Sequence, residues 1–268
     1  MPELPEVQTV VDTLRPAVLG RHIACFELLR SDFASPGDLD WGSSLQGRTV
    51  ASLGRRAKRI VFGLDDGNAF YAHLGMTGRV TFGSADRQRA KHTHACLRFS
   101  HGEVHFVDAR RFGGLTWLGS DVPDTELGPE PLEMKPAELA RRLLRTRRAV
   151  KTALLDQRLI AGLGNIYADE ALFLARIHPT VPGERLSREA IGRLCRGIKT
   201  TLRKAIRHRG STLRDYVDAD GRAGDFRRLH QVYDRAGEPC NRCGKPIHRT
   251  VLGGRSTHFC GRCQSRKM

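Results

Sequence analysis

The first element that the hydrophobic pattern predicts is a helix near the N-terminus. From Val7 to Leu14, apolar residues recur at the three- and four-residue spacing that places side chains on one face of a helix. Pro16 and Gly20 follow, and both residue types are typical of the end of a helix. The pattern therefore predicts one amphipathic helix that presents the N-terminus to whatever lies beyond it.

A different pattern, of short β-type runs separated by turn residues, extends from residue 22 to residue 118. Asp66-Gly67 and His101-Gly102 lie where hairpin turns are expected. The runs that we expect to be strands are 23–29, 59–64, 69–74, 95–99, 104–107 and 115–118. Many short strands at regular spacing predict an antiparallel β-sandwich or barrel.

Helical spacing returns after Gly128-Pro129-Glu130-Pro131, a segment typical of a linker between domains. The expected helices are 137–144, 150–155, 166–175 and 188–208, and a basic edge runs from Arg145 to Lys151. Two glycines precede the third helix in Gly162-Leu163-Gly164-Asn165, so backbone N–H groups can approach an anion and Asn165 can cap the helix. This arrangement fits a helix-turn-helix type of phosphate clamp, although glycines before a helix are common.

The segment from Asp218 to Phe226 contains two glycine turns, Asp220-Gly221 and Ala223-Gly224, and we expect a mobile loop here. Such a loop either closes over a ligand or simply connects two domains. The sequence pattern alone leaves both alternatives open.

Four of the seven cysteines form the most specific spacing pattern in the chain. Cys240-X2-Cys243 and Cys260-X2-Cys263 are separated by 16 residues, and this spacing allows four thiolates to surround zinc tetrahedrally. Four cysteines fill the coordination shell, so the predicted ion is structural; a redox dithiol is the alternative. Basic residues between the two pairs are expected to face a nucleic acid, namely Lys245, His248, Arg249 and Arg255. The remaining cysteines are predicted to be buried, namely Cys25, Cys96 and Cys195.

The net charge of the chain indicates which class of partner it binds. Across 268 residues, 45 lysines and arginines stand against 29 acidic residues, which gives a formal charge of +16 and a pI near 10.3. This excess indicates nucleic acid as partner, because neutralising phosphates releases counterions. A membrane is disfavoured, since no apolar run approaches the ~18 to 20 residues of a spanning helix. No signal-peptide core precedes Pro2, and the odd number of cysteines favours a reducing compartment.

Basic and glycine-containing loops lie between the expected strands, at residues 55–59, 73–78 and 108–114. A charge cluster in a loop is usually a solvated surface. Met76 and Phe112, however, are apolar residues in otherwise polar loops, as wedging between stacked bases requires. The alternative for both side chains is burial in the core.

The first residues combine a secondary amine with two carboxylates. If Met1 is removed, Pro2 becomes a free N-terminal imino group, whose pKa near ~8 leaves it partly unprotonated at neutral pH. Such an amine can attack an electrophilic sugar carbon and form a Schiff base, with Glu3 adjacent to move protons and Glu6 near the positive end of the helix. The alternative is an ordinary chain start in which Pro5 opens a helix.

Taken together, these motifs resemble the bacterial formamidopyrimidine-DNA glycosylase family over the whole length of the chain. The resemblance rests on Pro-Glu-Leu-Pro-Glu-Val, Arg-Arg-Ala-Lys, His-Leu-Gly-Met-Thr-Gly, Arg-Arg-Phe-Gly, Gly-Leu-Gly-Asn-Ile-Tyr-Ala and the paired cysteines, in this order. It implies an α+β fold in three parts. These are an antiparallel β-sandwich catalytic domain with an N-terminal helix at 1–127, a helical helix-two-turns-helix domain at 128–230, and a β-hairpin zinc finger at 231–268.

The resemblance also implies a role for each matching residue. Pro2 attacks C1′ of the damaged nucleotide, Glu3 transfers protons and Glu6 supports the site, while Lys58 contacts a phosphate near the lesion. Met76, Arg110 and Phe112 fill the gap left by the extruded base, and Arg110 pairs with the orphaned cytosine. Two further residues, Asn165 and Arg255, hold backbone phosphates. Tyr167, also assigned to the DNA-binding set, supports the helical clamp. The loop over the lesion contributes Asp218, Asp220, Gly221, Arg222, Gly224, Asp225 and Phe226.

The implied protein is a bifunctional glycosylase and apurinic/apyrimidinic lyase of base excision repair. It removes 8-oxoguanine and formamidopyrimidines opposite cytosine and cuts the strand by β,δ-elimination. It carries zinc, acts as a monomer on double-stranded DNA with oxidised bases or abasic sites, and works in the bacterial cytoplasm at the nucleoid. The alternatives are the related endonuclease VIII, which favours oxidised pyrimidines and usually has glycine in place of Leu4, and a non-catalytic binder of damaged DNA.

Three positions depart from the family pattern. Gln8 and Ala109 stand where the family often has glutamate and proline, and little effect is expected from either. Asp225 stands in the loop over the lesion where related sequences often have an aromatic or uncharged residue, which leaves the exact lesion preference open.

Overall fold

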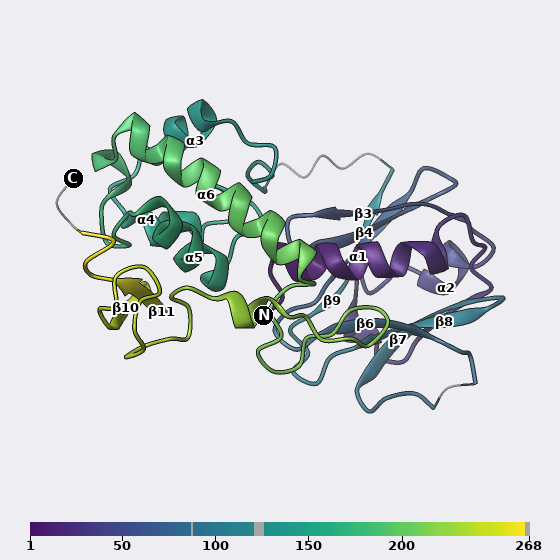
Figure 1. Cartoon of the computed structure of the whole chain (residues 1–268). Helices are drawn as coiled ribbons and strands as arrows, with labels where there is room; N and C mark the ends of the chain where they lie inside the picture. The colour runs from purple at the N-terminus through teal and green to yellow at the C-terminus, as the bar shows by residue number, and fades with distance from the viewer. Residues whose placement is uncertain (87, 121–125, 266–268) are drawn as a thin grey trace. The chain divides into compact units, whose positions relative to one another are not determined.

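A computed structural model describes residues 1–86, 88–120 and 126–265 of the chain (Figure 1). Contacts between residues group the chain into two compact units. Unit 1 consists of Met1–Asp124 with His208–Asp225, and unit 2 consists of Thr125–Arg207 with Phe226–Met268. The three-part division at residues 127 and 230 stays a prediction, and the contacts add that segment 208–225 packs with the N-terminal residues.

The predicted N-terminal helix is present as α1, Leu4–Val18. Pro5 suits the first turn because its missing N–H would have no partner there in any helix. Pro16 lies inside the last turn of α1, and the helix ends between Pro16 and Gly20, the two residues predicted to end it. The helix continues to Val18 because this side chain is fully buried against the core, and it ends where Leu19 adopts an extended conformation.

Two β-sheets make up most of unit 1. One has five strands in the order β2-β9-β5-β4-β3, and the other has four in the order β1-β7-β8-β6. The strands are β1 Cys25–Leu28, β2 Ala34–Ser35, β3 Val50–Arg56, β4 Arg59–Leu64, β5 Ala69–His73, β6 Arg79–Gly83, β7 Thr93–Phe99, β8 Gly102–Val107 and β9 Gly114–Gly119. Two short helical segments accompany them, η1 Ser31–Phe33 and α2 Trp41–Leu45. Among the described strand pairs, β2 and β9 are parallel and the others are antiparallel.

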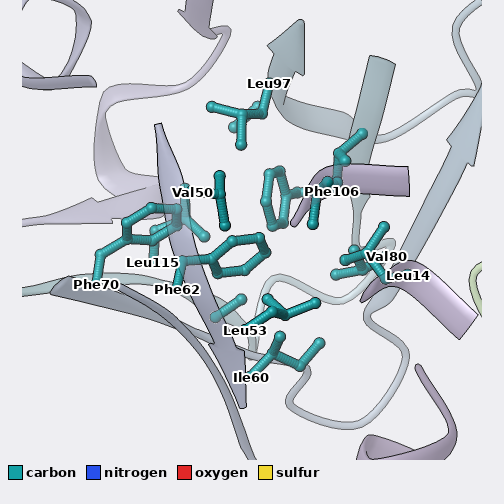
Figure 2. Close-up of a cluster of buried hydrophobic side chains, with 14 of the residues drawn as sticks. Leu14, Val50, Leu53, Ile60, Phe62, Phe70, Val80, Leu97, Phe106 and Leu115 are labelled. Carbon is teal, nitrogen blue, oxygen red and sulfur yellow. The ribbon is translucent and has the colours of Figure 1, made fainter. Parts of the chain in front are cut away.

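Apolar side chains from both sheets form one core (Figure 2). The ring of Phe62 on β4 stacks on Phe70 of β5 with 4.7 Å between ring centroids. It also meets Phe106 of β8, with 6.4 Å between centroids. Because β4 and β8 belong to different sheets, this shared core confirms the predicted sandwich.

Helix α1 covers an open side of the sandwich. It contacts β3 and β4 of one sheet and β6 of the other, and β3 and β6 are edge strands. An uncovered edge presents unpaired N–H and C=O groups to other chains, so the helix protects both sheets. Segment 208–225 adds to this cover, because the N–H of Phe82 on β6 donates to the carbonyl of Ala219.

Unit 2 contains the predicted helices and the cysteine hairpin. Its elements are α3 Pro136–Leu143, α4 Val150–Leu154, α5 Asn165–Ala175, η2 Gly183–Arg185, α6 Arg188–Arg207, η3 Phe226–Leu229, β10 Ile247–Leu252 and β11 Arg255–Cys260. Helices α5 and α6 approach closely at Gly197, where a Cβ atom would lie 3.0 Å from the carbonyl oxygen of Ala171. The segment expected to be a linker packs within this unit, since the N–H of Gly128 donates to the carbonyl of Gln157 at 2.8 Å.

The core of unit 1 can be tested separately, because both tryptophans of the chain, Trp41 and Trp117, lie in this unit. Phe62→Ala should lower its free energy of unfolding by about 3–5 kcal/mol, since a fully buried ring is replaced by a cavity. Urea unfolding followed by tryptophan fluorescence measures this loss. Leu29→Ala, at a side chain that is 42% exposed, is the control and should change stability by no more than about 0.5 kcal/mol. Equal losses in the two variants would contradict the assignment of the core.

Candidate active site and nucleic-acid interface

The start of the chain is held at the N-terminal end of α1 by the Glu6 carboxylate. Its Oε2 accepts the N–H of Glu3 at 2.8 Å, and its Oε1 accepts the N–H of Ser211 at 2.7 Å. Pro2, Glu3 and Glu6 are all buried. The structure therefore brings the predicted nucleophile and both predicted carboxylates together in a fixed position.

Segment 208–225 packs against this chain start. The hydroxyl of Tyr216 donates to the carbonyl of Glu6 at 3.2 Å. Gly210 has a φ of +78°, and a Cβ atom there would lie 2.6 Å from Oε1 of Glu6. Glycine is favoured at this position, because a side chain would be strained by the backbone conformation and would displace the Glu6 carboxylate.

Lys58 lies in the tight turn between β3 and β4, beside Ala57, which has a φ of +54°. The turn is tied to α1 by Arg55, whose Nε donates to the amide oxygen of Gln8 at 2.9 Å and whose Nη1 donates to the carbonyl of Ala57 at 2.8 Å. Only 8% of Lys58 is exposed. The neutral Gln8 amide thus provides the acceptor that holds the turn carrying Lys58 to α1, the helix that directly follows Pro2 and Glu3.

The side chains of Met76 and Phe112 are 42% and 54% exposed. These values exclude the alternative that either side chain belongs to the core. The guanidinium of Arg110 lies over the ring of Phe112, 4.8 Å from its centroid. An exposed ring paired with a cation, and an exposed thioether, suit a surface that inserts into stacked bases.

Part of the predicted mobile loop is firmly anchored in unit 1. The carboxylate of Asp218 is fully buried, forms an ion pair with Arg209 and accepts the N–H of Asp220 and of Arg222 at 3.0 and 2.9 Å. The N–H of Ala219 donates to the hydroxyl of Thr13 on α1 at 3.1 Å. Residues 220–223 and Asp225 are exposed. Mobility of this segment stays a prediction, and the anchors leave residues 220–223 as its exposed tip.

In unit 2, Asn165 is the first residue of α5 and Gly164 is the N-cap, so the prediction that Asn165 caps the helix is wrong. The side-chain Nδ2 instead donates to Oγ of Ser256 on β11 at 3.3 Å. Its Oδ1 is buried and accepts no hydrogen bond within the described part of the chain. The amide is therefore turned towards the strand that also carries Arg255, next to the tip of the hairpin.

A buried network that the sequence did not reveal holds β11 against the helices. The ammonium of Lys151 on α4 lies 2.7 Å from Asp169 of α5 and donates to the carbonyl of Ser256 at 2.6 Å. Asp169 also accepts the N–H of His258 at 2.9 Å. Lys151 and Asp169 are almost fully buried, so Lys151 does not belong to the exposed basic edge in which the sequence placed it. Removing one partner of such a pair would leave an uncompensated charge.

Tyr167 is fully buried, and its ring centroid lies 5.7 Å from that of Phe226. Tyr167 therefore supports α5 from within unit 2, and a direct contact with DNA is excluded for this side chain. Phe226 is likewise buried, at the start of η3. These two predicted site residues form part of the packing of unit 2.

The four cysteines converge as their spacing predicts. The sulfur atoms of Cys240 and Cys263 are 3.9 Å apart, those of Cys243 and Cys260 are 3.5 Å apart, and all four lie within 4.8 Å of one another. A tetrahedral zinc with Zn–S bonds of ~2.3 Å would place the sulfurs ~3.8 Å apart. Backbone N–H groups point at two of the sulfurs, from Arg242 to Cys240 and from Cys263 to Cys260, both at 3.4 Å. The geometry fits one structural zinc ion.

A second buried cluster on the four-stranded sheet, formed by Cys96, Glu103 and His105, has the residue types of a metal site. The Glu103 carboxylate is already engaged by guanidinium groups, at 3.1 Å from Arg98 and 3.5 Å from Arg89. Burial raises the pKa of the Cys96 thiol to about 12, which keeps it protonated. This cluster is an ion-pair network that ties the segment around Arg89 to the sheet.

Comparison with known proteins places the chain in a family. Three family models match it: the formamidopyrimidine-DNA glycosylase N-terminal domain at residues 1–115, the formamidopyrimidine-DNA glycosylase H2TH domain at 127–217, and a zinc finger found in FPG and IleRS at 237–266. The formamidopyrimidine-DNA glycosylases of Desulfitobacterium hafniense and Solibacter usitatus are each 44% identical to this chain, over 98% and 99% of it and 100% of their own lengths. The chain belongs to the formamidopyrimidine-DNA glycosylase family.

Solved structures of relatives share the fold. A Lactococcus lactis FPG mutant in complex with Fapy-dG-containing DNA has a TM-score of 0.93 at 35% identity, and the match covers 99% of this chain and 100% of that one. The Lactococcus lactis Fpg in complex with DNA containing an abasic site has a TM-score of 0.92 at 34% identity, covering 98% and 100%. Within residues 1–86, 88–120 and 126–265, no helix combines the length and apolarity that a membrane crossing needs.

The zinc site gives a direct prediction. The purified protein should contain one zinc per chain, and Cys260→Ala should lose it because three thiolates no longer close the coordination shell. Elemental analysis after gel filtration measures the content. Cys195→Ala, at a buried cysteine of α6 outside the cluster, is the matched control and should retain the metal. Retention of zinc by Cys260→Ala would rule out this ligand set.

Proposed function

We propose that this DNA glycosylase of base excision repair removes oxidised purines from duplex DNA and then cuts the strand, with Pro2 as its nucleophile. The observation that carries the proposal is the buried, hydrogen-bonded chain start, in which Glu6 fixes the residue next to Pro2. A mobile terminus is a poor nucleophile because its attack geometry is rarely populated. A fixed terminus holds the amine where the sugar carbon can meet it.

The chemistry follows from a secondary amine. The Pro2 nitrogen attacks C1′ of the damaged nucleotide, the base leaves with a proton, and opening of the sugar ring gives an iminium ion. Because proline nitrogen bears no hydrogen after this step, the iminium keeps its positive charge and acidifies the C2′ proton. Loss of this proton expels the 3′ phosphate, and a second elimination expels the 5′ phosphate. Glu3, buried next to Pro2, is proposed to transfer the protons.

The DNA-holding residues divide between the two units. In unit 1, Lys58 contacts a phosphate, and Met76, Arg110 and Phe112 fill the gap that the extruded base leaves, with Arg110 on the orphaned cytosine. In unit 2, Asn165 and Arg255 bind phosphates from α5 and from the zinc hairpin. The formal charge of +16 supports phosphate binding by the chain, since each phosphate contact needs a cation or a donor.

Lesion choice is proposed to favour purines. The Lactococcus lactis relatives are bound to Fapy-dG-containing and abasic-site DNA, which supports both the purine branch and the lyase step. Leu4, at the position where endonuclease VIII usually has glycine, favours the purine branch; its side chain is fully buried in α1, so it acts through packing. The exposed part of segment 218–226, namely residues 220–223 and Asp225, is proposed to close over the base, and Asp225 is proposed as the position that tunes lesion preference. We place the protein, as a monomer, at the nucleoid in the bacterial cytoplasm.

Borohydride trapping tests the nucleophile. Protein without Met1 should form a covalent adduct with a duplex containing 8-oxoguanine or an abasic site, because borohydride reduces the iminium. Protein that retains Met1 should bind the same duplex without trapping, since an acylated Pro2 nitrogen cannot attack. Intact mass and peptide mapping locate the adduct. Trapping at a residue other than Pro2 would overturn the assignment of the nucleophile. Trapping on no duplex at all would rule out the lyase mechanism and favour a non-catalytic binder. Preferred release of dihydrothymine over 8-oxoguanine would favour the endonuclease VIII branch.

The phosphate contact of the zinc hairpin is tested by salt dependence. Arg255→Ala should weaken binding and reduce the slope of log K against log salt by about 0.9, the value for one phosphate contact. Fluorescence anisotropy on a duplex with an uncleavable abasic analogue measures the slope. Arg193→Ala is the control, because Arg193 pairs with Glu189 at 2.8 Å on α6. An unchanged slope in Arg255→Ala would remove Arg255 from the set of phosphate contacts.

A further inference from the structure

Two loops of unit 1 cross between the same two sheets. Residues 74–78 join β5 of the five-stranded sheet to β6 of the four-stranded sheet, and residues 108–113 return from β8 to β9. The first loop carries Met76, and the second carries Arg110 and Phe112. The side chains proposed to fill the gap in DNA therefore come from separate loops that must act as one surface.

A single carboxylate connects these loops. Asp108 is 1% exposed, and its Oδ1 accepts the hydroxyl of Thr77 at 2.5 Å and the N–H of Arg110 at 3.1 Å. Its Oδ2 accepts the N–H of Gly113 at 2.7 Å. One side chain thus holds the first loop through a hydroxyl and the second loop at both ends of the Arg110–Phe112 segment.

The backbones of the two loops also touch. Gly75 has a φ of +55°, and a Cβ atom there would overlap the backbone of Phe112. A Cβ atom on Gly113 would lie 2.5 Å from the carbonyl oxygen of His73. With glycines at both contacts, the spacing between the loops is set by backbone atoms and by Asp108.

We infer that Asp108 is a positioning residue that makes Met76, Arg110 and Phe112 one preorganised wedge for base extrusion. This inference rests on the proposed function. Extruding a stacked base requires the wedge to enter as the base leaves, and loops that are ordered beforehand lose less conformational entropy at that moment. An abasic site has no base to unstack, so its cleavage depends less on the wedge.

Asp108→Asn keeps the shape of the side chain but replaces one carboxylate oxygen by an NH2 group. With the remaining oxygen on Thr77 and Arg110, this NH2 group faces the backbone N–H of Gly113, which then loses its acceptor. We expect release of 8-oxoguanine to slow about tenfold or more, as for loss of a charge-assisted hydrogen bond, while cleavage at a preformed abasic site changes less than about threefold. Single-turnover assays on the two duplexes give this ratio. A 2-aminopurine next to the lesion reports insertion of the wedge, and its fluorescence phase should slow by the same factor as base release.

Thr77 provides a second variant that does not alter the carboxylate. Thr77→Val should share the selective defect, and Thr77→Ser, which keeps the hydroxyl, should remain within about twofold of the unchanged protein. Asp65→Asn, in the exposed turn between β4 and β5, is the matched control for loss of a negative charge. Equal slowing on both duplexes, or no slowing in Asp108→Asn and Thr77→Val, would overturn the inference. Failure of the unchanged protein to act on either duplex would instead overturn the proposed function.

Discussion

The arrangement of unit 1 depends on holding the start of the chain still. Chain ends are normally poorly ordered unless they are tied down. Here the apolar face of α1 is buried from Leu4 onward, and the Glu6 carboxylate joins the N–H groups of Glu3 and Ser211. The position of Ser211 then fixes segment 208–225 beside the helix, and Ala219 continues the contact to the edge of β6. The residues proposed for chemistry and those proposed for lesion choice thus share one anchor.

Buried carboxylates that anchor the backbone, as Glu6 does, occur in both units. These carboxylates accept two or more backbone N–H groups from residues outside the helices and strands, where no regular structure satisfies those donors. They are Glu6 (Glu3 and Ser211), Asp108 (Arg110 and Gly113), Asp218 (Asp220 and Arg222) and Glu170 (Gln231, Val232 and Tyr233). A chain with a strong excess of cations therefore uses these acidic residues inside, as loop anchors. Arg110, Arg255 and other cations remain outward, where a polyanion can meet them.

Short-range patterns predicted much of this structure, and long-range contacts account for the differences. The run 59–64 matches β4, because alternation along one strand is a local property. β3 was missed because Val50–Arg56 ends in glycine and two arginines, and it becomes a strand only by pairing with β4.

The zinc-binding cysteines could be predicted from the sequence, because the spacing within each pair is local. The burial of Lys151 could not, because its partners Asp169 and Ser256 are distant in sequence. Asn165 was misread as a cap for the same reason, since its partner lies on β11.

The three departures from the family pattern fall where these anchors can accommodate them. Gln8 still offers an oxygen to Arg55, so the turn that carries Lys58 keeps its tie to α1 without a carboxylate. Ala109 lacks the rigidity of proline, yet it lies between Asp108 and Arg110, whose hydrogen bond fixes the backbone on either side of it. Asp225 is exposed, and its N–H donates to the carbonyl of His208. A negative charge at that point changes the surface of the segment without disturbing its backbone anchor, so the proposed effect of Asp225 on lesion preference requires no change in the fold of the loop.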